Sequence, residues 1–253
     1  MIGQDKYYQL AKKASLEIGN HSGLITIQTL VAQSKNILDV GCGEGSRLNL
    51  FLGENIKGTG VDVSSFAIKK ANKQYPHHKF IQVKGEKLPF PSDSFDMVYS
   101  TFVLEHTHNQ ELFIKELTRV TKIGGVIAIL CPNYGAPNRR SPVSTEKPLQ
   151  KLLLGFVEDF FPGKNTRLSF TEVTPKKVFK TADDDTTCEP YLLKLSRFVK
   201  NFSNIKIVTS STLWKIDDKA KSIHQRIFKM LGTLNIYPFK FWGPQLFLIL
   251  KKV

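Results

Sequence analysis

Cysteine, long apolar runs and acidic residues are scarce in this sequence, and each absence excludes a class of protein. The 253 residues include only three cysteines, Cys42, Cys131 and Cys188, and no C-x-x-C pair. We therefore expect neither a disulfide framework nor a zinc site, and a reducing cytoplasmic location fits best. No apolar run approaches the about 20 residues that cross a bilayer, and no secretory signal is apparent. We expect a soluble protein without a transmembrane segment.

The shortage of acidic residues is concentrated in the second half of the chain. Lys and Arg number 36 against 22 Asp and Glu, which gives a net charge of +14. Residues 1–130 carry 15 basic and 12 acidic residues, whereas residues 131–253 carry 21 and 10. This excess indicates either a solvated basic face or an anionic partner, such as nucleic acid, a phosphorylated substrate or a membrane surface.

Short apolar runs alternate with helical patterns from residue 36 onward, and 41% of the residues are hydrophobic. Strands are predicted at residues 36–40, 58–63, 79–84, 94–100, 126–131, 204–210 and 245–251. Apolar residues spaced three and four apart predict helices at residues 46–52, 64–75, 109–122, 189–202 and 215–234. Gly124 and Gly125 are expected to stop the helix that begins at residue 109. Continuous apolar strands between helices indicate a parallel sheet that is buried on both faces.

The stretch ILDVGCGEGS leads from the first strand through a glycine-rich turn into a helix. Such a turn lets a ligand approach the backbone, and the helix N-terminus offers unpaired N–H groups. The spacing Gly41-x-Gly43-x-Gly45 is neither the G-x-G-x-x-G of dinucleotide-binding proteins nor a P-loop. Asp39 precedes the turn and would repel a pyrophosphate, but it suits a ligand with an ammonium or sulfonium group.

Asp62 ends the second predicted strand. An acidic side chain at this place can accept hydrogen bonds from both hydroxyls of a ribose. It can also serve as an ordinary cap where the strand gives way to a helix. The glycine-rich turn at the end of the neighbouring strand favours the ribose interpretation.

Four segments in this order resemble the class I S-adenosylmethionine-dependent methyltransferases: ILDVGCGEGS, GVDVS, KGEKLPFPSDSFDMVYSTFVLEH and LTRVTKIGGVIAI. The likeness covers residues 36–131 and is closest to the branch that methylates small molecules, quinone precursors, lipids and glycans. It implies a Rossmann-like α/β fold, with a doubly wound, seven-stranded, mostly parallel sheet whose last strand is antiparallel. Helices would cover both faces, with a helical insertion after strand 5. The implied cofactor is S-adenosyl-L-methionine.

On this interpretation residues 1–253 form one methyltransferase domain with four parts. Residues 1–34 would form N-terminal helices, and residues 35–131 would form the cofactor-binding half. Residues 132–188, rich in Pro, Asn, Ser and Lys, would form an insertion that caps the substrate. Helix–strand units over residues 189–253 would complete the sheet.

The resemblance also implies which residues bind the cofactor. They lie at the ends of the first four strands and in the turns that follow: Asp39, Gly41, Cys42, Gly43, Gly45, Asp62, Val63, Gly85, Glu86, Lys87 and Thr101. Asp39 and the glycines would hold the methionine part, Asp62 the ribose, and Val63 would pack on the adenine. Most relatives have an aspartate in place of Lys84. Backbone groups at Gly85 and Glu86, or the Glu86 carboxylate, are expected to replace its contact.

The segment FVLEH, residues 102–106, bears on catalysis. Quinone-ring O-methylating relatives have E-x-x-E-H here, which supplies metal ligands and a base. Phe102 replaces the first acid, so we expect no metal. His106 is the candidate general base, because an imidazole titrates near neutrality. Alternatively, Glu105 and His106 cap the following loop and only shape the pocket.

The acceptor is expected to meet the insertion. Its candidate features are Tyr134, Arg139, Arg140, the apolar face of Leu152, Leu153, Phe156 and Phe160 within a predicted helix at 149–161, and Lys176-Lys177. They suit an amphipathic or phosphorylated acceptor such as a lipid-linked glycan, although the helix could equally complete the core. Asp183–Asp185 could orient sugar hydroxyls, bind a metal or form a solvated turn.

The predicted function is therefore methyl transfer (EC 2.1.1) to an oxygen or nitrogen of a small-molecule, lipid or glycan acceptor. One alternative is an RNA methyltransferase that uses the basic second half. However, no RNA-binding module is recognisable, and the N/D-P-P-Y/F motif of amino-methylating enzymes is missing. A second alternative is an inactive methyltransferase-fold scaffold. The identity of the acceptor and the oligomeric state stay open.

Overall fold

The computed structural model of the chain describes residues 21–53, 56–163, 167–176, 182–213 and 223–253. Of the N-terminal helices predicted over residues 1–34, it describes α2 (Ser22–Ala32). The rest of that prediction, and the start of the helix predicted at residues 215–234, lie outside the described residues.

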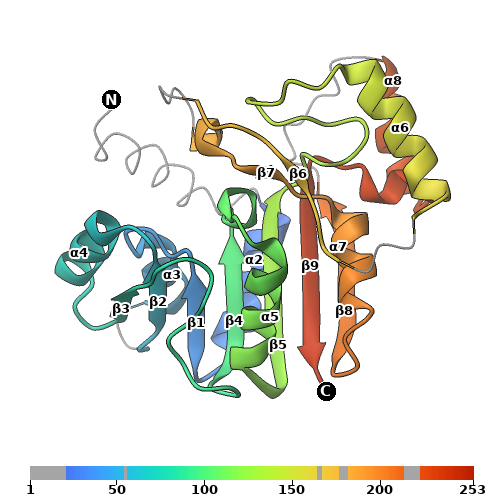
Figure 1. Cartoon of the computed structure of the whole chain (residues 1–253). Helices are drawn as coiled ribbons and strands as arrows, with labels where there is room; N and C mark the ends of the chain where they lie inside the picture. Colours follow the sequence, from blue (N-terminus) through green and yellow to red (C-terminus); the bar gives the residue numbers. More distant parts are fainter. Residues whose placement is uncertain (1–20, 54–55, 164–166, 177–181, 214–222) are drawn as a thin grey trace.

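A seven-stranded sheet forms the centre of the molecule (Figure 1). Its strands are β1 (Ile37–Val40), β2 (Thr59–Asp62), β3 (Lys79–Gln82), β4 (Phe95–Thr101), β5 (Thr121–Pro132), β8 (Ile205–Leu213) and β9 (Gln245–Lys252). Their order across the sheet is β3-β2-β1-β4-β5-β9-β8, and β9 runs antiparallel to both of its neighbours. The seven predicted strands and the antiparallel last strand are confirmed.

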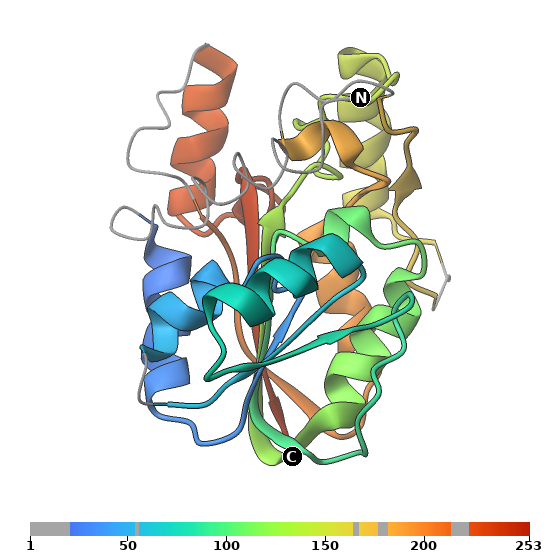
Figure 2. The same ribbon diagram turned by 90° about the vertical axis from the view of Figure 1, so that its left-hand side faces the viewer.

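Helices cover both faces of this sheet (Figure 2). One face is packed by α2, α3 (Ser46–Leu52) and α4 (Ser65–Gln74), and the other by α5 (Gln110–Val120) and α7 (Leu192–Val199). Side chains alternate between two cores, as the pleat of a strand requires. On β4, Met97 and Tyr99 belong to the first core, whereas Val98 belongs to the second.

The boundary between α5 and β5 differs from the prediction. The helix already ends at Val120, and Thr121 has extended backbone angles and begins the strand. Gly124 and Gly125 therefore lie inside β5 and do not stop the helix. Gly124 has a φ of 81°, and the β4–β5 register shifts at this end of the pair. The two glycines permit the irregular pairing at this end of the strand.

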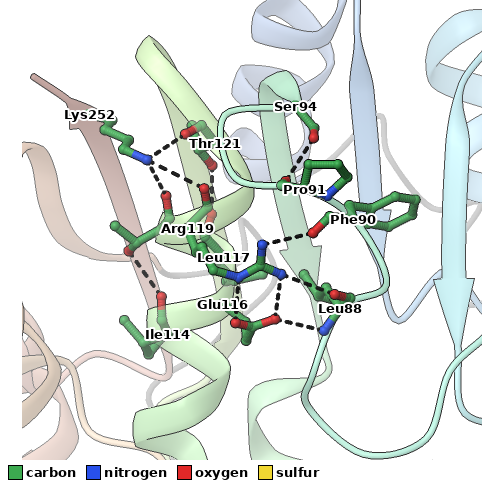
Figure 3. Close-up of polar contacts among 11 residues, drawn as sticks. Leu88, Phe90, Pro91, Ser94, Ile114, Glu116, Leu117, Arg119, Thr121 and Lys252 are labelled. Carbon is green, nitrogen blue, oxygen red and sulfur yellow. Dashed lines mark hydrogen bonds and ion pairs between the residues drawn. The ribbon is translucent and has the colours of Figure 1, made fainter.

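A polar network holds the loop before β4 against α5 (Figure 3). The Arg119 guanidinium donates to the carbonyls of Phe90 (2.7 Å) and Leu88 (3.0 Å) and pairs with Glu116. Glu116 in turn accepts the Leu88 N–H at 2.8 Å. Lys252 lies beside this network. The part of the loop that follows Gly85, Glu86 and Lys87 is therefore held in place.

The segment 132–188 contains α6 (Pro148–Phe160), η2 (Ala182–Asp185) and a small sheet of β6 (Thr171–Glu172) and β7 (Cys188–Glu189). The helix lies where the sequence predicts it, but of its residues only Asp159 is buried. Leu152 packs against the main core, whereas Leu153, Phe156 and Phe160 are exposed, so the apolar face completes the core only through Leu152.

Farther along the chain, the helix predicted from residue 189 begins only at Leu192, because Glu189 belongs to β7. The 3-10 turn η3 (Phe239–Phe241) and the helix α8 (Ile223–Thr233) precede the last strand. No helix within the described ranges has the length and apolar character needed to cross a membrane.

Candidate active site

The glycine-rich turn lies at the carboxyl end of β1. The N–H groups of Gly41 and Cys42 both donate to the carbonyl of Val61 on β2, at 2.8 and 3.0 Å. All three glycines of the turn have a positive φ, which other residues rarely adopt. The turn is therefore held tightly to the neighbouring strand, and its curvature depends on glycine.

The space around the three glycines differs. A Cβ atom on Gly41 would lie 2.2 Å from a methyl group of Val103, and one on Gly45 would lie 2.5 Å from the Phe80 ring. A Cβ on Gly43 would meet no atom within 4 Å. Gly41 and Gly45 therefore pack against the protein, whereas Gly43 borders open space where a ligand can pass. The Cys42 side chain is buried, so only its backbone faces the turn.

Asp39 is buried beneath this turn. One carboxylate oxygen accepts a hydrogen bond from the Tyr99 hydroxyl at 3.0 Å, and the other is buried with no hydrogen-bond partner. Burial raises the pKa of Asp39 to about 7, although the charge of Arg47 opposes the shift. Asp39 thus offers an unused acceptor to a positively charged ligand.

Asp62 connects the turn to the next strand end. Its two carboxylate oxygens accept the N–H groups of Gly43 and Ser64, each at 2.9 Å. Burial raises the pKa of Asp62, while these N–H groups and the nearby His106 lower it. A carboxylate oxygen can accept a further hydrogen bond, so a ribose can be held here. Beside it, the Val63 side chain is 61% exposed and presents an apolar surface.

Arg47 is a site residue that the sequence interpretation missed. From α3 its guanidinium donates to the Thr101 hydroxyl at the end of β4 and lies 5.4 Å from the centre of the Phe102 ring. Its Nε group is buried with no partner. The sequence feature that could have identified Arg47 is its position, two residues after Gly45 and in the first turn of the predicted helix.

Phe102 marks the end of β4 with a φ of 60°. A bulky residue in the left-handed region is strained, and such strain gathers at functional sites. Its N–H donates to the carbonyl of Leu130 at 2.7 Å, which holds the backbone in this conformation. Thr101 is buried immediately before it. The bend turns the following segment, with Glu105 and His106, across the ends of the strands.

The turn after β3 carries the remaining predicted cofactor residues. Gly85 has a φ of 65°, and a Cβ there would meet no atom within 4 Å. One Glu86 oxygen accepts the N–H groups of His108 (2.9 Å) and Asn109 (3.1 Å), immediately before α5. This oxygen is therefore engaged in the protein's own structure, whereas the backbone of Gly85 and of the exposed Lys87 is accessible.

Glu105 and His106 lie in the turn η1 (Leu104–His106). The Glu105 carboxylate is fully buried, neither oxygen has a hydrogen-bond partner, and burial raises its pKa to about 7. His106 Nε2 lies 3.8 Å from a Glu105 oxygen, and Nδ1 lies 3.3 Å from Asp185 Oδ1. Glu105 therefore does not cap the following loop through its side chain.

The three aspartates of η2 play separate roles. Asp183 accepts a hydrogen bond from the Tyr134 hydroxyl, Asp185 faces His106, and the buried Asp184 pairs with Lys176 at 2.7 Å. The interpretation as a solvated turn is therefore wrong for Asp184. Over the described residues, no cluster of three or more potential metal ligands occurs.

Other basic residues predicted to meet the acceptor bind the protein itself. Arg139 donates to the Trp242 carbonyl at 3.4 Å, and Arg140 donates to the Glu146 carbonyl at 2.7 Å. Lys177 lies outside the described residues. An anionic acceptor would therefore compete with these contacts.

The residues at the strand ends fit the cofactor that the resemblance implies. Gly43 borders open space, a buried Asp39 oxygen lacks a partner, and Arg47 offers an unused N–H. A methionine moiety carries an ammonium group, which suits the Asp39 carboxylate. It also carries a carboxylate, which suits the Arg47 guanidinium. Asp62 and Val63 supply a ribose acceptor and an apolar platform on the adjacent strand.

Comparison with known proteins supports this interpretation. Residues 38–129 match a family described as a methyltransferase domain. A "probable S-adenosylmethionine-dependent methyltransferase" of Mycobacterium tuberculosis is 29% identical over 113 residues, which are 44% of this chain and 41% of that protein. The 2-methyl-6-phytyl-1,4-hydroquinone methyltransferase of Synechocystis is 34% identical over 47% of this chain and 38% of that protein. The chain thus spans about two fifths of the length of these relatives.

The fold extends beyond the region that matches in sequence. The crystal structure of a SAM-dependent methyltransferase from Aquifex aeolicus superposes with a TM-score of 0.54 at 12% identity, over 98% of both chains. At this identity the likeness establishes the fold, including the strands outside residues 38–129.

Proposed function

We propose that the chain is a class I S-adenosylmethionine-dependent methyltransferase that transfers a methyl group to an oxygen or nitrogen of a small-molecule, lipid or glycan acceptor, and the match of residues 38–129 to a methyltransferase domain supports this. The observation that carries this proposal is a pair of buried polar atoms without a partner, one Asp39 oxygen and Arg47 Nε, each four residues along the chain from the open position at Gly43. Asp62, from the adjacent strand, holds the N–H of Gly43.

The chain's own task in this reaction is binding and alignment. S-adenosylmethionine, when bound, supplies a methyl group that is already activated on a sulfonium. Holding the acceptor about 3 Å from that methyl and in line with the breaking bond then provides most of the acceleration. The strained Phe102 and the buried Thr101 form the rigid edge against which this alignment is made.

His106 is the residue suited to remove a proton from a hydroxyl acceptor. The Asp185 carbonyl and carboxylate oxygens both lie 3.3 Å from Nδ1, and they favour a proton there. Nε2 is then the proton acceptor. Once it is protonated, the Asp185 carboxylate 3.3 Å from Nδ1 stabilises the charge. An amine acceptor needs no such base, so the importance of His106 depends on the acceptor atom.

The substitution His106→Ala tests this assignment. With a hydroxyl acceptor we expect the rate of methyl transfer to fall about 10²-fold or more. The affinity for S-adenosylhomocysteine should stay within about twofold, since the imidazole is assigned to the acceptor side. Turnover by the variant at the wild-type rate would remove His106 from the mechanism. His108→Ala, two residues farther along, is the matched control.

The acceptor class can be found with labelled cofactor. The protein and methyl-labelled S-adenosylmethionine are incubated with cell extract, which is then separated into glycan, lipid, small-molecule and RNA fractions. Label in one of the first three supports the proposal, and label in RNA contradicts the acceptor class. Failure to bind S-adenosylhomocysteine in a calorimetric titration would instead support an inactive scaffold.

A further inference from the structure

Helix α6 is attached to the molecule by its polar side chains. The Asp159 carboxylate is buried and accepts hydrogen bonds from the Tyr191 hydroxyl (2.6 Å) and the Trp242 indole N–H (2.8 Å). One turn from the other end, the Lys151 ammonium pairs with the buried Glu189 and donates to the Tyr134 carbonyl at 3.0 Å. Surface helices usually turn their apolar face toward the core. This helix does so only through Leu152, and its other large apolar side chains are exposed.

The apolar side chains of α6 point to solvent as a consequence. Six large ones on α6, and Phe161 just beyond its end, are between 42% and 80% exposed: Leu149, Leu153, Leu154, Phe156, Val157, Phe160 and Phe161. Leu149, Leu153, Val157 and Phe160 follow one another at intervals of three or four residues and so share one face of the helix. Isolated exposed apolar residues are ordinary, but a continuous row of large ones marks an interaction surface.

Helix α8 repeats this arrangement. Its residues Ile223, Ile227 and Met230, with Leu234 just beyond it, lie at intervals of three or four and are between 44% and 70% exposed. Its inner side is anchored by Phe228, whose ring contacts Trp242 at a centroid distance of 5.3 Å.

Trp242 connects the two helices, since its ring also lies 6.2 Å from that of Phe156 on α6. Both helices stand at the end of the sheet where the parallel strands finish (Figure 1, Figure 2). We call the exposed apolar residues of α6, Phe161, Ile223, Ile227, Met230 and Leu234 the α6–α8 surface. It lies at the same end of the molecule as the candidate active site.

The charged residues in and just after α8, the second helix of the α6–α8 surface, are all basic. Residues 223–240 contain three Lys and Arg, namely Arg226, Lys229 and Lys240, and no Asp or Glu. Arg226 is exposed on α8, and Lys147 is exposed at the start of α6. On α6 itself, Glu158 is paired with Lys194 at 3.0 Å. Apolar rows bordered by basic side chains are the pattern of helices that lie in a membrane interface.

We propose that the α6–α8 surface docks the protein onto an anionic lipid bilayer. The apolar rows of both helices enter the boundary between headgroups and acyl chains, while Arg226, Lys147 and their basic neighbours bind anionic headgroups. Docking in this way brings the carboxyl ends of the strands toward the membrane.

The charge pattern favours a bilayer over a second copy of the chain. A symmetric dimer through this surface would place two copies of the segment 223–240, which has three basic residues and no acidic one, against each other. Protein interfaces also tend to be depleted in lysine at their centre. An anionic headgroup layer neutralises the same charges, and its acyl region accommodates two separate helices of unequal apolar content.

Vesicle flotation of the full chain tests the proposal, using vesicles of phosphatidylcholine with and without phosphatidylglycerol. We expect flotation with the anionic vesicles and roughly tenfold weaker binding to the neutral ones. Leu149→Ser with Leu153→Ser, Ile227→Ser with Met230→Ser, and Lys147→Glu with Arg226→Glu should each weaken binding to the anionic vesicles about tenfold or more. The assay contains no methyl donor, so its result is independent of the proposed enzymatic activity.

Matched controls come from the opposite end of the sheet. Ile123 is 75% exposed near the start of β5, and Lys35 is exposed before β1. Ile123→Ser and Lys35→Glu should leave vesicle binding unchanged. Thermal unfolding of every variant shows that it is folded.

Three results would overturn the proposal. The first is a wild-type protein that does not float with anionic vesicles. The second is binding that the α6 and α8 variants and the controls alter equally. The third is a dimer in light scattering that these variants dissociate, because the surface would then bind a second copy.

Discussion

Single residues at the candidate active site combine structural and binding duties. Asp62 shows this most directly, because it holds the N–H of Gly43 in the glycine-rich turn and that of Ser64 at the start of α4. One carboxylate therefore holds the glycine-rich turn and the start of α4 together. The remaining lone pairs are what we assign to the ribose.

The substitution Asp62→Asn separates these duties. The amide keeps one acceptor for the backbone but loses the charge. We expect the affinity for S-adenosylhomocysteine to fall by about 1.5–3 kcal/mol, which is roughly tenfold to a hundredfold. Calorimetric titration measures this, with thermal unfolding as the check on folding. Wild-type affinity in the folded variant would contradict the assignment.

Glu105 makes stability depend on pH. Its carboxyl loses its proton near pH 4.5 in the unfolded chain, but its pKa is about 7 in the folded protein. The folded form therefore binds more protons between these values, and stability is lost as the pH rises through about 7. Glu105→Gln keeps the neutral shape at every pH.

The free energy of unfolding of the wild type should fall between pH 4.5 and pH 8. We expect that of Glu105→Gln to fall less, and the difference between the two falls should be about 2–3 kcal/mol. Denaturant titrations at the two pH values measure the difference. Glu172→Gln, at an exposed position in β6, is the control. Equal pH dependence in wild type and variant would show that Glu105 is not held neutral.

Arg47 shows where residue-level prediction stopped. An arginine in the first turn of a helix is common on protein surfaces, and nothing in its sequence position shows that Thr101, more than fifty residues away, accepts its hydrogen bond. Asp39 and Asp62 were predicted as site residues from their positions in the chain. Asp39 directly precedes the glycine-rich turn, and Asp62 ends the second predicted strand. Arg47 becomes a site residue only when β1 and β4 are neighbours.

At the scale of elements, the glycine-rich turn is a cradle whose three glycines have different purposes. Gly41 and Gly45 avoid collisions with Val103 and Phe80, whereas Gly43 keeps space open. A substitution at Gly41 or Gly45 therefore tests the packing of the fold. Only Gly43 isolates ligand binding.

We expect Gly43→Ala to weaken S-adenosylhomocysteine binding at least roughly tenfold while reducing stability by only about 1–2 kcal/mol, the cost of a left-handed alanine. Gly124→Ala is the matched control, because Gly124 also has a positive φ and no atom within 4 Å of its Cβ position. It should lose similar stability without losing affinity. Unchanged affinity in Gly43→Ala would place the cofactor elsewhere.

The elements also show which local signals are dependable. The helix at 46–52 and the strand at 245–251 were placed to within a residue, because their apolar periodicity and their ends coincide. The end of α5 was misplaced because two glycines were taken for a helix stop. Thr121 belongs to the strand because it pairs with β4. Local propensity cannot predict this, because it contains no information about the neighbouring strand.

At the scale of the whole molecule, Lys252 ties the last strand to the rest of the sheet. Its buried ammonium donates to the carbonyls of Thr118 (3.1 Å) and Thr121 (2.9 Å) (Figure 3). It also donates to Asp93 Oδ1 at 2.9 Å. Residues more than 130 positions apart are thereby joined at the end of the sheet opposite the candidate active site.

The substitution Lys252→Met removes this connection. We expect a loss of about 2–4 kcal/mol in the free energy of unfolding, because buried carbonyls are left without a donor. Urea denaturation measures it, and the affinity for S-adenosylhomocysteine should be unaffected since the site is distant. The exposed neighbour Lys251→Met serves as the control. Equal stability of the two variants would show that the connection contributes nothing.

The sequence by itself determined the fold class, the family and the strand ends that hold Asp39, Gly43 and Asp62. These depend on local periodicity and on short motifs, which a chain displays before it folds. Only the tertiary structure decided that α6 turns its apolar face outward. That orientation follows from Asp159 and Lys151, whose partners come from residues 32 to 83 positions farther along the chain. An amphipathic pattern states that two faces exist, and the contacts made in three dimensions determine which one is buried.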